Sequence, residues 1–211
     1  MSLAESMFGR SIFLKLMAAV SVGALSLGVS ACTSDANSIA AQAKSGDGKG
    51  FVSGDGTIER VALDQRPAPL TLNGTTLQGT PWKVADAVDK VLVLNVWGSW
   101  CGPCVAEMPH LQQVWSQVSS AGKPVQFMGI NYRDGAETAK AFLRVNKITY
   151  PSLADDGGRT LLALRGKANT TPTTLVLDRR GRIAARVSGP VTVATLTGLV
   201  KDVLGEAGSD G

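Results

Sequence analysis

Residues 91–109, which read VLVLNVWGSWCGPCVAEMP, decide the fold of this chain. The first six are a mostly apolar run rich in valine, and such a run is typical of a buried strand. After Cys104, large apolar side chains recur at the spacing of one helical face, at Met108, Leu111, Trp115 and Val118. The pattern therefore predicts a strand that passes directly into a helix, with Cys101 at the junction.

The position of Cys101 matters for its chemistry. The first turn of a helix has unpaired backbone N–H groups and the positive end of the helix dipole. Both favour the thiolate, which is the reactive form of a cysteine. We therefore interpret Cys101 as a candidate reactive thiol.

The N-terminus has the pattern of a secretory signal. Arg10 and Lys15 precede a short apolar stretch, residues 16–29, which is followed by small residues. The apolar stretch is shorter than the ~20 residues that a membrane-spanning helix needs. We predict that residues 1–31 are removed as a signal peptide; the alternative is a buried N-terminal helix.

The signal-like segment ends in Val29-Ser30-Ala31-Cys32, which resembles the lipobox of bacterial lipoproteins. The resemblance implies that Cys32 is lipidated and becomes the mature N-terminus, so that the chain is anchored to the outer face of the cell membrane. The alternative is an ordinary signal cleavage that leaves Cys32 free or disulfide-bonded. Lipidation would leave one pair among the three cysteines of the chain.

The composition divides the mature chain into a tether and one domain. Residues 32–57 are mainly Ser, Gly, Asp, Ala and Lys, and we predict a flexible tether there. Residues 58–205 have the size of a single domain, and residues 206–211 are predicted to be a disordered tail.

The charge of the mature chain is too mild to indicate a nucleic-acid partner. Without residues 1–31 there remain 19 basic and 16 acidic residues, a net charge of +3. The densest basic cluster is Arg179, Arg180 and Arg182, in an Asp-Arg-Arg-Gly turn between two apolar runs. We interpret it as a solvated hairpin tip rather than a binding patch.

The remaining patterns predict an α/β sandwich around a mixed sheet. Residues 70–77 predict a hairpin with a tight turn at Asn73-Gly74. The other predicted strands are 91–97, 125–131, 150–153, 173–177 and 182–187, and the predicted helices are 101–119, 137–146, 159–164 and 193–204. Pro109 is expected to kink the first of these helices rather than end it.

These residues resemble a known fold. Trp-Cys-Gly-Pro-Cys at a strand-to-helix junction, followed 70 residues later by Thr171-Pro172 before a strand, is similar to the thioredoxin fold. The hairpin at the start of the domain is an extension of that fold. Glu107-Met108-Pro109 and the added strand and helix over residues 125–146 resemble the membrane-anchored TlpA/ResA-like branch. The likeness covers about residues 58–204.

The resemblance implies a thiol-disulfide oxidoreductase with a redox-active disulfide between Cys101 and Cys104. Cys101 would attack a substrate disulfide, and Cys104 would resolve the mixed disulfide. We expect no cofactor and no metal. The alternative for the cysteines is half of a zinc site, but zinc needs about four ligands and His110 is the only histidine. We expect His110 itself to be an exposed helix residue.

The resemblance also assigns roles around the cysteines. Pro172 matches the cis-proline of the fold, which presents the backbone of the preceding Thr171 to an extended substrate; the alternative is a trans proline at the start of a strand. Where thioredoxin has a buried aspartate, this chain has Asn95, which cannot titrate. Glu107 matches a glutamate of ResA-like proteins, and if partly buried it would exchange a proton with Cys104. The alternative for Glu107 is a solvent-facing helix residue.

Two tryptophans are expected to wall the site. Trp97 and Trp100 would shield the thiols and offer substrate an apolar surface, although core packing explains Trp97 nearly as well.

The direction of electron flow is open at this stage. One hypothesis is reduction of exported apocytochrome c, with a membrane electron donor that recharges the protein. Another is oxidation or isomerisation of exported proteins. A binding module with structural cysteines is the alternative from a different class. A thiol peroxidase is disfavoured, because neither cysteine ends a Pro-x-x-x-Thr-x-x-Cys loop.

Overall fold

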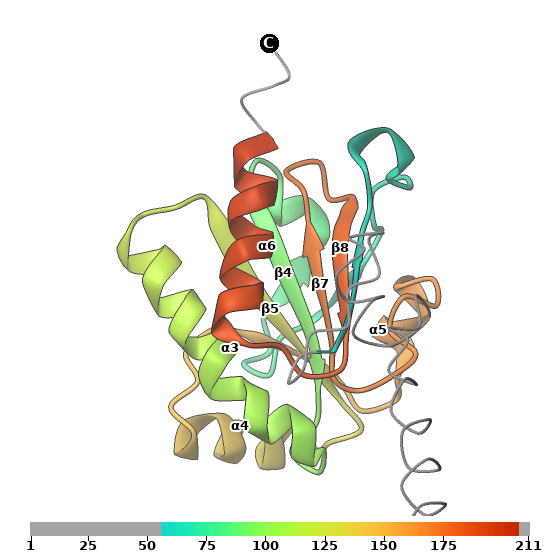
Figure 1. Cartoon of the computed structure of the whole chain (residues 1–211). Helices are drawn as coiled ribbons and strands as arrows, with labels where there is room; N and C mark the ends of the chain where they lie inside the picture. The colour runs from blue at the N-terminus through green and yellow to red at the C-terminus, as the bar shows by residue number, and fades with distance from the viewer. Residues whose placement is uncertain (1–55, 207–211) are drawn as a thin grey trace, which may run out of the picture. The chain divides into compact units, whose positions relative to one another are not determined.

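A six-stranded mixed sheet forms the centre of the structure, a computed structural model that describes residues 56–206 (Figure 1). The strand order is β1-β8-β7-β4-β5-β6. The strands are β1 (Thr57–Arg60), β4 (Val91–Trp97), β5 (Val125–Tyr132), β6 (Ser152–Asp155), β7 (Thr173–Leu177) and β8 (Ile183–Ser188). β4, β5 and β6 are parallel, whereas β7 is antiparallel to β4, and β8 and β1 continue the antiparallel pairing. The predicted mixed sheet is therefore confirmed.

Strand β4 is buried along its whole length because helices and loops cover both faces of the sheet. Val91, Val93 and Trp97 belong to a core that they share with α3 (Gly102–Ser120), α4 (Ala136–Val145) and α6 (Val193–Gly205). The alternate residues Leu92, Leu94 and Val96 belong to a second core. The elements that close this second core are β3 (Pro81–Lys83), the 3-10 helix η2 (Val84–Ala87) and α5 (Arg159–Ala163). The sheet thus separates two apolar layers, and α3 and α6 lie together on one side (Figure 1).

The hairpin at the start of the domain is present, but its predicted turn is wrong. Asn73 and Gly74 lie inside β2 (Asn73–Thr75), which pairs with β3. A Cβ on Gly74 would lie 3.2 Å from a methyl group of Leu153, so a glycine permits close packing there. The turn spans residues 76–80 instead and contains Gly79, whose φ of 85° suits a glycine. A 3-10 helix, η1 (Leu63–Gln65), precedes the hairpin.

Strand β1 was not predicted, and it brings the start of the domain to one end of the sheet. In the strand register Thr57 lies beside Ser188, which pairs with Thr173, which in turn pairs with Val96 of β4. The N–H group of Gly56 continues this contact and donates to the carbonyl of Pro190, at 2.7 Å. The first described residues therefore lie at the end of the sheet where β4 passes into α3.

Some predictions fall outside the described residues: the signal peptide, Cys32, nearly all of the tether, and residues 207–211 of the tail. Glu206, which was placed in the predicted tail, is described, and its carboxylate lies 2.6 Å from the guanidinium of Arg66. Between residues 56 and 206, no helix combines the length and apolarity needed to cross a membrane.

Candidate active site

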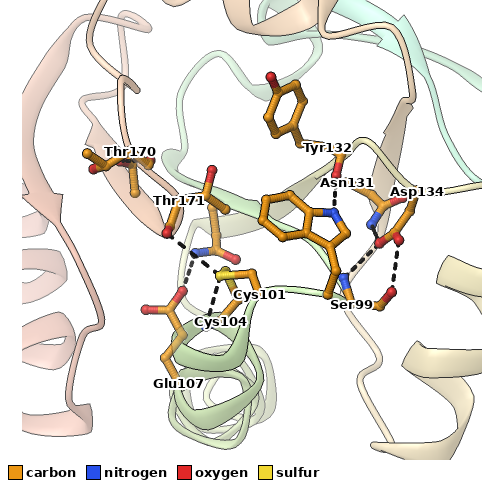
Figure 2. The surroundings of a disulfide bond; sticks show 12 residues. Ser99, Cys101, Cys104, Glu107, Asn131, Tyr132, Asp134, Thr170 and Thr171 are labelled. Carbon is orange, nitrogen blue, oxygen red and sulfur yellow. Dashed lines mark hydrogen bonds between the residues drawn. A yellow bond between two sulfur atoms is a disulfide. The ribbon is translucent and has the colours of Figure 1, made fainter.

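Cys101 and Cys104 are joined by a disulfide bond at the start of α3 (Figure 2). Cys101 is the N-cap residue, and its sulfur accepts a hydrogen bond from the N–H group of Cys104 at 3.3 Å. Cys101 is 5% exposed, whereas Cys104 is completely buried. Cys101 is therefore the more exposed of the two cysteines, and it occupies a helix N-terminus, a position that favours the thiolate form of a reduced cysteine.

The Thr171-Pro172 peptide faces the disulfide from the start of β7. Its bond is cis, as predicted. The carbonyl oxygen of Thr171 lies 3.7 Å from the sulfur of Cys101 (Figure 2). The hydroxyl of Thr173 donates to the carbonyl of Thr170 at 2.6 Å, which ties this bend together. The backbone of Thr171 is thus placed beside the reactive sulfur, where an extended substrate could pair with it.

Glu107 is buried beside the cysteine pair, so the alternative of a solvent-facing glutamate is wrong. One carboxylate oxygen accepts from the side-chain amide of Asn95 at 2.8 Å, and the other accepts from the N–H group of Val191 at 3.0 Å. Burial raises the pKa of Glu107 to about 8, although both hydrogen bonds act to lower it. The carboxyl group can therefore take or give a proton near neutral pH.

The surroundings of Glu107 are apolar or neutral. Among the described residues, its hydrogen-bond partners are an amide side chain and a backbone N–H group, and neither carries charge. The phenol of Tyr150 is also buried, and both burial and the charge of Glu107 raise the pKa of Tyr150. The Asn95 amide also donates to Thr174 at 3.1 Å, which ties the site to β7. A charge on Glu107 is consequently compensated by hydrogen bonds alone.

Trp100 is the exposed aromatic residue of the site. The residue is 54% exposed, and its indole N–H donates to the carbonyl of Tyr132 at 3.1 Å. The two rings meet edge to face, with centroids 6.4 Å apart. This arrangement leaves an apolar surface next to Cys101, as expected from the sequence.

The loop before Cys101 is held by Asp134, a residue that sequence analysis missed. The carboxylate of Asp134 accepts from the N–H group and the hydroxyl of Ser99, at 2.7 and 2.8 Å (Figure 2). It also accepts from the side chain of Asn131 at 2.8 Å. Asp134 follows β5 in the chain, so the approach to the cysteines is fixed from the neighbouring strand. Only proximity in the fold reveals this contact.

Trp97 and His110 lie near the site in different settings. Trp97 is fully buried in the same apolar core as Cys101 and Cys104, packs on Phe142 at 5.4 Å between ring centroids, and donates to Ser152 at 3.2 Å. Core packing, the alternative, is its observed role. His110 is half-buried rather than exposed, because its ring faces the β8–α6 loop, with Nδ1 3.1 Å from the carbonyl oxygen of Val191.

The predicted basic tip joins β7 to β8, near the other end of these strands. It is only partly solvated: Arg180 is exposed, but Arg182 pairs with Asp178 at 2.8 Å. Asp178 also binds the buried Arg66, at 3.1 Å, and accepts from the N–H groups of Arg180 and Arg182. Burial acts to raise the pKa of Asp178, yet these donors hold it below its usual value. The tip is thus built on a buried ion cluster.

The geometry around the disulfide suits thiol-disulfide exchange. The two sulfurs form a disulfide at a helix N-terminus, Cys101 is the more exposed of the two cysteines, and a carboxyl group with a pKa of about 8 lies one helical turn beyond Cys104. The cis peptide and Trp100 offer the substrate backbone and apolar contacts. These are the parts that attack on a disulfide and resolution of the mixed disulfide require.

Known proteins agree with this chemistry. Residues 65–186 match the model of the AhpC/TSA family. The thiol:disulfide interchange protein HelX of Rhodobacter capsulatus is 33% identical over 145 residues, 68% of this chain and 78% of HelX. The thiol-disulfide oxidoreductase ResA of Bacillus anthracis is 26% identical over 129 residues, 61% of this chain and 72% of ResA.

Solved structures agree as well. A secreted thiol-disulfide isomerase from Corynebacterium glutamicum superposes with a TM-score of 0.67 at 31% identity, over 70% of this chain and 92% of that one. A DsbF homologue from Corynebacterium diphtheriae superposes with a TM-score of 0.64 at 34% identity, over 72% and 96%. This chain therefore belongs to the AhpC/TSA family of thioredoxin-fold proteins, and it is a thiol-disulfide oxidoreductase of the DsbE/ResA/HelX type.

Proposed function

We propose that this protein is a lipid-anchored, extracytoplasmic reductant of disulfides in exported proteins. The observation that supports the exchange chemistry is the Cys101–Cys104 disulfide at the start of α3, with the buried Glu107 beside it. The direction of exchange is proposed from the resemblance to the TlpA/ResA-like branch, and the anchor from the lipobox at Cys32. Apocytochrome c is the proposed substrate, on the strength of the resemblance to the TlpA/ResA-like branch. A membrane electron donor would return the protein to its dithiol form.

The proposed cycle moves two electrons from the protein to the substrate. The Cys101 thiolate attacks one sulfur of the substrate disulfide, forms a mixed disulfide and releases the other sulfur as a thiolate. Glu107 then takes the proton of the Cys104 thiol, and the Cys104 thiolate attacks the sulfur of Cys101. This step closes the Cys101–Cys104 disulfide and releases the second substrate sulfur as a thiolate, which takes the proton held by Glu107. The first substrate thiolate takes a proton from solvent, so the substrate leaves as a dithiol. A donor dithiol reverses the same steps to reset the pair.

The substrate is proposed to lie along Thr171 and against Trp100. The backbone of Thr171 lies beside the Cys101 sulfur, and the exposed face of Trp100 lies on the same end of the sheet. An extended peptide could therefore pair with the backbone while an apolar side chain contacts the indole.

Catalysis is tested with insulin and with a model peptide disulfide in the presence of a reductant. The wild-type protein is expected to accelerate reduction, and Cys101→Ser is expected to abolish the acceleration. Gln113→Ala, at an exposed position of α3, is the control and should behave as wild type. Unchanged turnover in Cys101→Ser would remove Cys101 from its proposed role.

The direction of electron flow is tested by the reduction potential. Equilibration of the Cys101–Cys104 pair with glutathione or dithiothreitol should give a reduction potential of about −270 mV, the value of thioredoxin. An oxidase or isomerase for exported proteins is the alternative, and it is supported by the relative from C. glutamicum, which is a thiol-disulfide isomerase. A reduction potential of about −120 mV, the value of DsbA, would favour that alternative.

Anchoring is proposed on the signal-like segment and on the lipobox that ends at Cys32. One chain of lipid binds a membrane marginally, whereas two or more hold it well. Cys32→Ser is therefore expected to move the protein from the membrane to the soluble fraction and to abolish labelling with a fatty-acid analogue. Retention of both in the variant would contradict lipidation of Cys32.

The substrate is identified by trapping. Cys104→Ala cannot resolve the mixed disulfide, so the partner should remain bound to Cys101 in membranes. Apocytochrome c is the partner that we expect to find in the trapped mixed disulfide. Recovery of other exported proteins alone would contradict that substrate, and the absence of any trapped species would count against Cys101 as the attacking thiol.

A further inference from the structure

Helix α3 holds one residue of the β8–α6 loop by both of its backbone groups. The N–H group of Val191 donates to Glu107 at 3.0 Å, and Nδ1 of His110 lies 3.1 Å from the carbonyl oxygen of Val191. Glu107 and His110 are three residues apart and therefore lie on one side of the helix. Because a carbonyl oxygen can only accept, the hydrogen bond requires the proton of the imidazole on Nδ1.

The same loop is in contact with the rest of the site. The N–H group of Gly189 donates to the carbonyl of Pro172 at 2.9 Å, and the carbonyl of Pro190 accepts from Gly56 at 2.7 Å. Residues 189–191 thus connect the cis peptide, the buried carboxyl group and the beginning of β1. His110 holds the carbonyl group of Val191 to α3, while Glu107 holds its N–H group.

We propose that His110 is a positioning residue, which holds Val191 so that its N–H group stays directed at the carboxyl group of Glu107. The proposal deepens the proposed function, since it concerns the group assigned there to exchange a proton with Cys104. Glu107 has two hydrogen-bond donors in the described structure, so the alignment of one of them matters. Hydrogen bonds weaken steeply as their angle and distance depart from the optimum.

The consequence for Glu107 has a definite sign. The Val191 N–H group stabilises the carboxylate, while burial disfavours it. If the loop shifts when His110 is removed, the carboxylate loses stabilisation and the proton is held more tightly. The midpoint of the Glu107 titration should then rise.

The experiment is a carbon-13 NMR titration of the oxidised protein with labelled glutamate side chains. His110→Ala should raise the Glu107 midpoint by about half a pH unit or more, a fraction of what loss of a whole charged hydrogen bond would produce. His110→Asn should restore most of the wild-type value, because its amide nitrogen can donate from the place of Nδ1. Gln113→Ala should leave the midpoint unchanged.

An unchanged midpoint in His110→Ala, or an Asn variant that behaves like the Ala variant, would overturn the proposal. A second measurement needs no variant: nitrogen-15 NMR of the wild-type imidazole should show the neutral ring protonated on Nδ1. Protonation on Nε2 alone would overturn the proposal even if every variant failed to fold.

The failure of this proposal is distinguishable from failure of the proposed proton exchange. The proton exchange between Glu107 and Cys104 is tested by the rate at which Cys104 resolves the mixed disulfide in Glu107→Gln. If that rate is unchanged while His110→Ala still moves the Glu107 midpoint, His110 positions Glu107 but Glu107 does not serve Cys104. If Glu107→Gln slows resolution and His110→Ala moves nothing, the positioning role is wrong and the proton exchange stands.

Discussion

Glu107 and Asp178 are both buried carboxylic acids, and they lie near opposite ends of β7. Glu107 accepts hydrogen bonds from Asn95 and Val191, which carry no charge, and burial raises its pKa to about 8. Asp178 accepts from Arg66, from Arg182 and from backbone N–H groups, and these donors lower its pKa in spite of burial.

The contrast shows that burial alone does not decide the charge of a carboxyl group. Desolvation pushes both pKa values upward, and the partners decide whether that push is overcome. With cationic partners, Asp178 stays an anion and organises the β7–β8 turn. With neutral partners, Glu107 stays close to the point at which it can gain or lose a proton. One carboxyl group is suited to structure and the other to proton transfer.

The largest expected effect comes from removing the carboxylate that has cationic partners. Asp178→Ala leaves Arg66 with a side chain 3% exposed and one anion fewer, and it leaves two turn N–H groups without their acceptor. We expect the free energy of unfolding to fall by about 3 to 5 kcal/mol, as measured by urea denaturation. Disulfide turnover by the folded fraction should be unchanged. A loss below about 1 kcal/mol would show that the cluster does not stabilise the turn.

The carboxyl group with neutral partners should matter to rate instead. Glu107→Gln keeps the size of the side chain but removes the proton acceptor. Resolution of the mixed disulfide by Cys104 should slow by about 100-fold, which corresponds to about 2.7 kcal/mol, in a single-turnover experiment. The attack by Cys101 should keep its rate and serves as the internal control. Equal slowing of both steps would indicate a general disturbance of the site.

The pH dependence of stability should have opposite signs for the two acids. The folded protein holds the Glu107 proton up to about pH 8, whereas an unfolded glutamate releases it near pH 4.3. Between these values the folded state binds more protons, so the free energy of unfolding falls as pH rises, by at most about 1.4 kcal/mol per pH unit. Stability from Asp178 is present above its unfolded pKa, about 3.9, and is lost as the pH falls through its lower folded value.

The measurement is the difference in unfolding free energy between wild type and Glu107→Gln across pH 5 to 8. Wild type should lose stability relative to the variant as pH rises through this window. Parallel curves would mean that Glu107 titrates as an ordinary glutamate. Asp178→Asn provides the matched comparison, since it should reduce the loss of stability in acid.

The smallest effect is expected for an exposed ion pair. Arg60 and Asp202 lie 3.6 Å apart, with side chains 55% and 61% exposed. Asp202→Ala should change the free energy of unfolding by less than about 1 kcal/mol in the same urea experiment. An effect as large as that of Asp178→Ala would undermine the role assigned to burial.

Sequence patterns predicted the elements whose signals are local. The valine-rich run of β4, the face of α3 and the cysteine pair all lie within a few turns of chain, and the structure has them where they were expected. β1 was missed because it has four residues and lies on an edge with only Ile58 fully buried. The Asn73-Gly74 turn was wrong because packing against Leu153, 79 residues on, outweighed a local preference.

The site shows the same division between local and distant contacts. Glu107 was found because it follows the cysteines closely, but the donors that fix its carboxyl group were not predicted. Val191 is 84 residues away in sequence, and Asp134 is 35 residues from Ser99. His110 was expected to be exposed, since the loop that covers it belongs to the far end of the chain. These contacts exist only after the sheet has brought the segments together.

The strand register that aligns Thr57 of β1 with Val96 of β4, through β8 and β7, has a consequence for where the enzyme works. The described chain begins at the end of the sheet that carries the cysteines, because Gly56 and Thr57 contact the loop and strand beside Pro172. If Cys32 carries the lipid, the 23 residues from 33 to 55 can span at most about 80 Å. The start of the domain would then lie within that distance of the bilayer, and the cysteine pair lies at the same end of the sheet as that start.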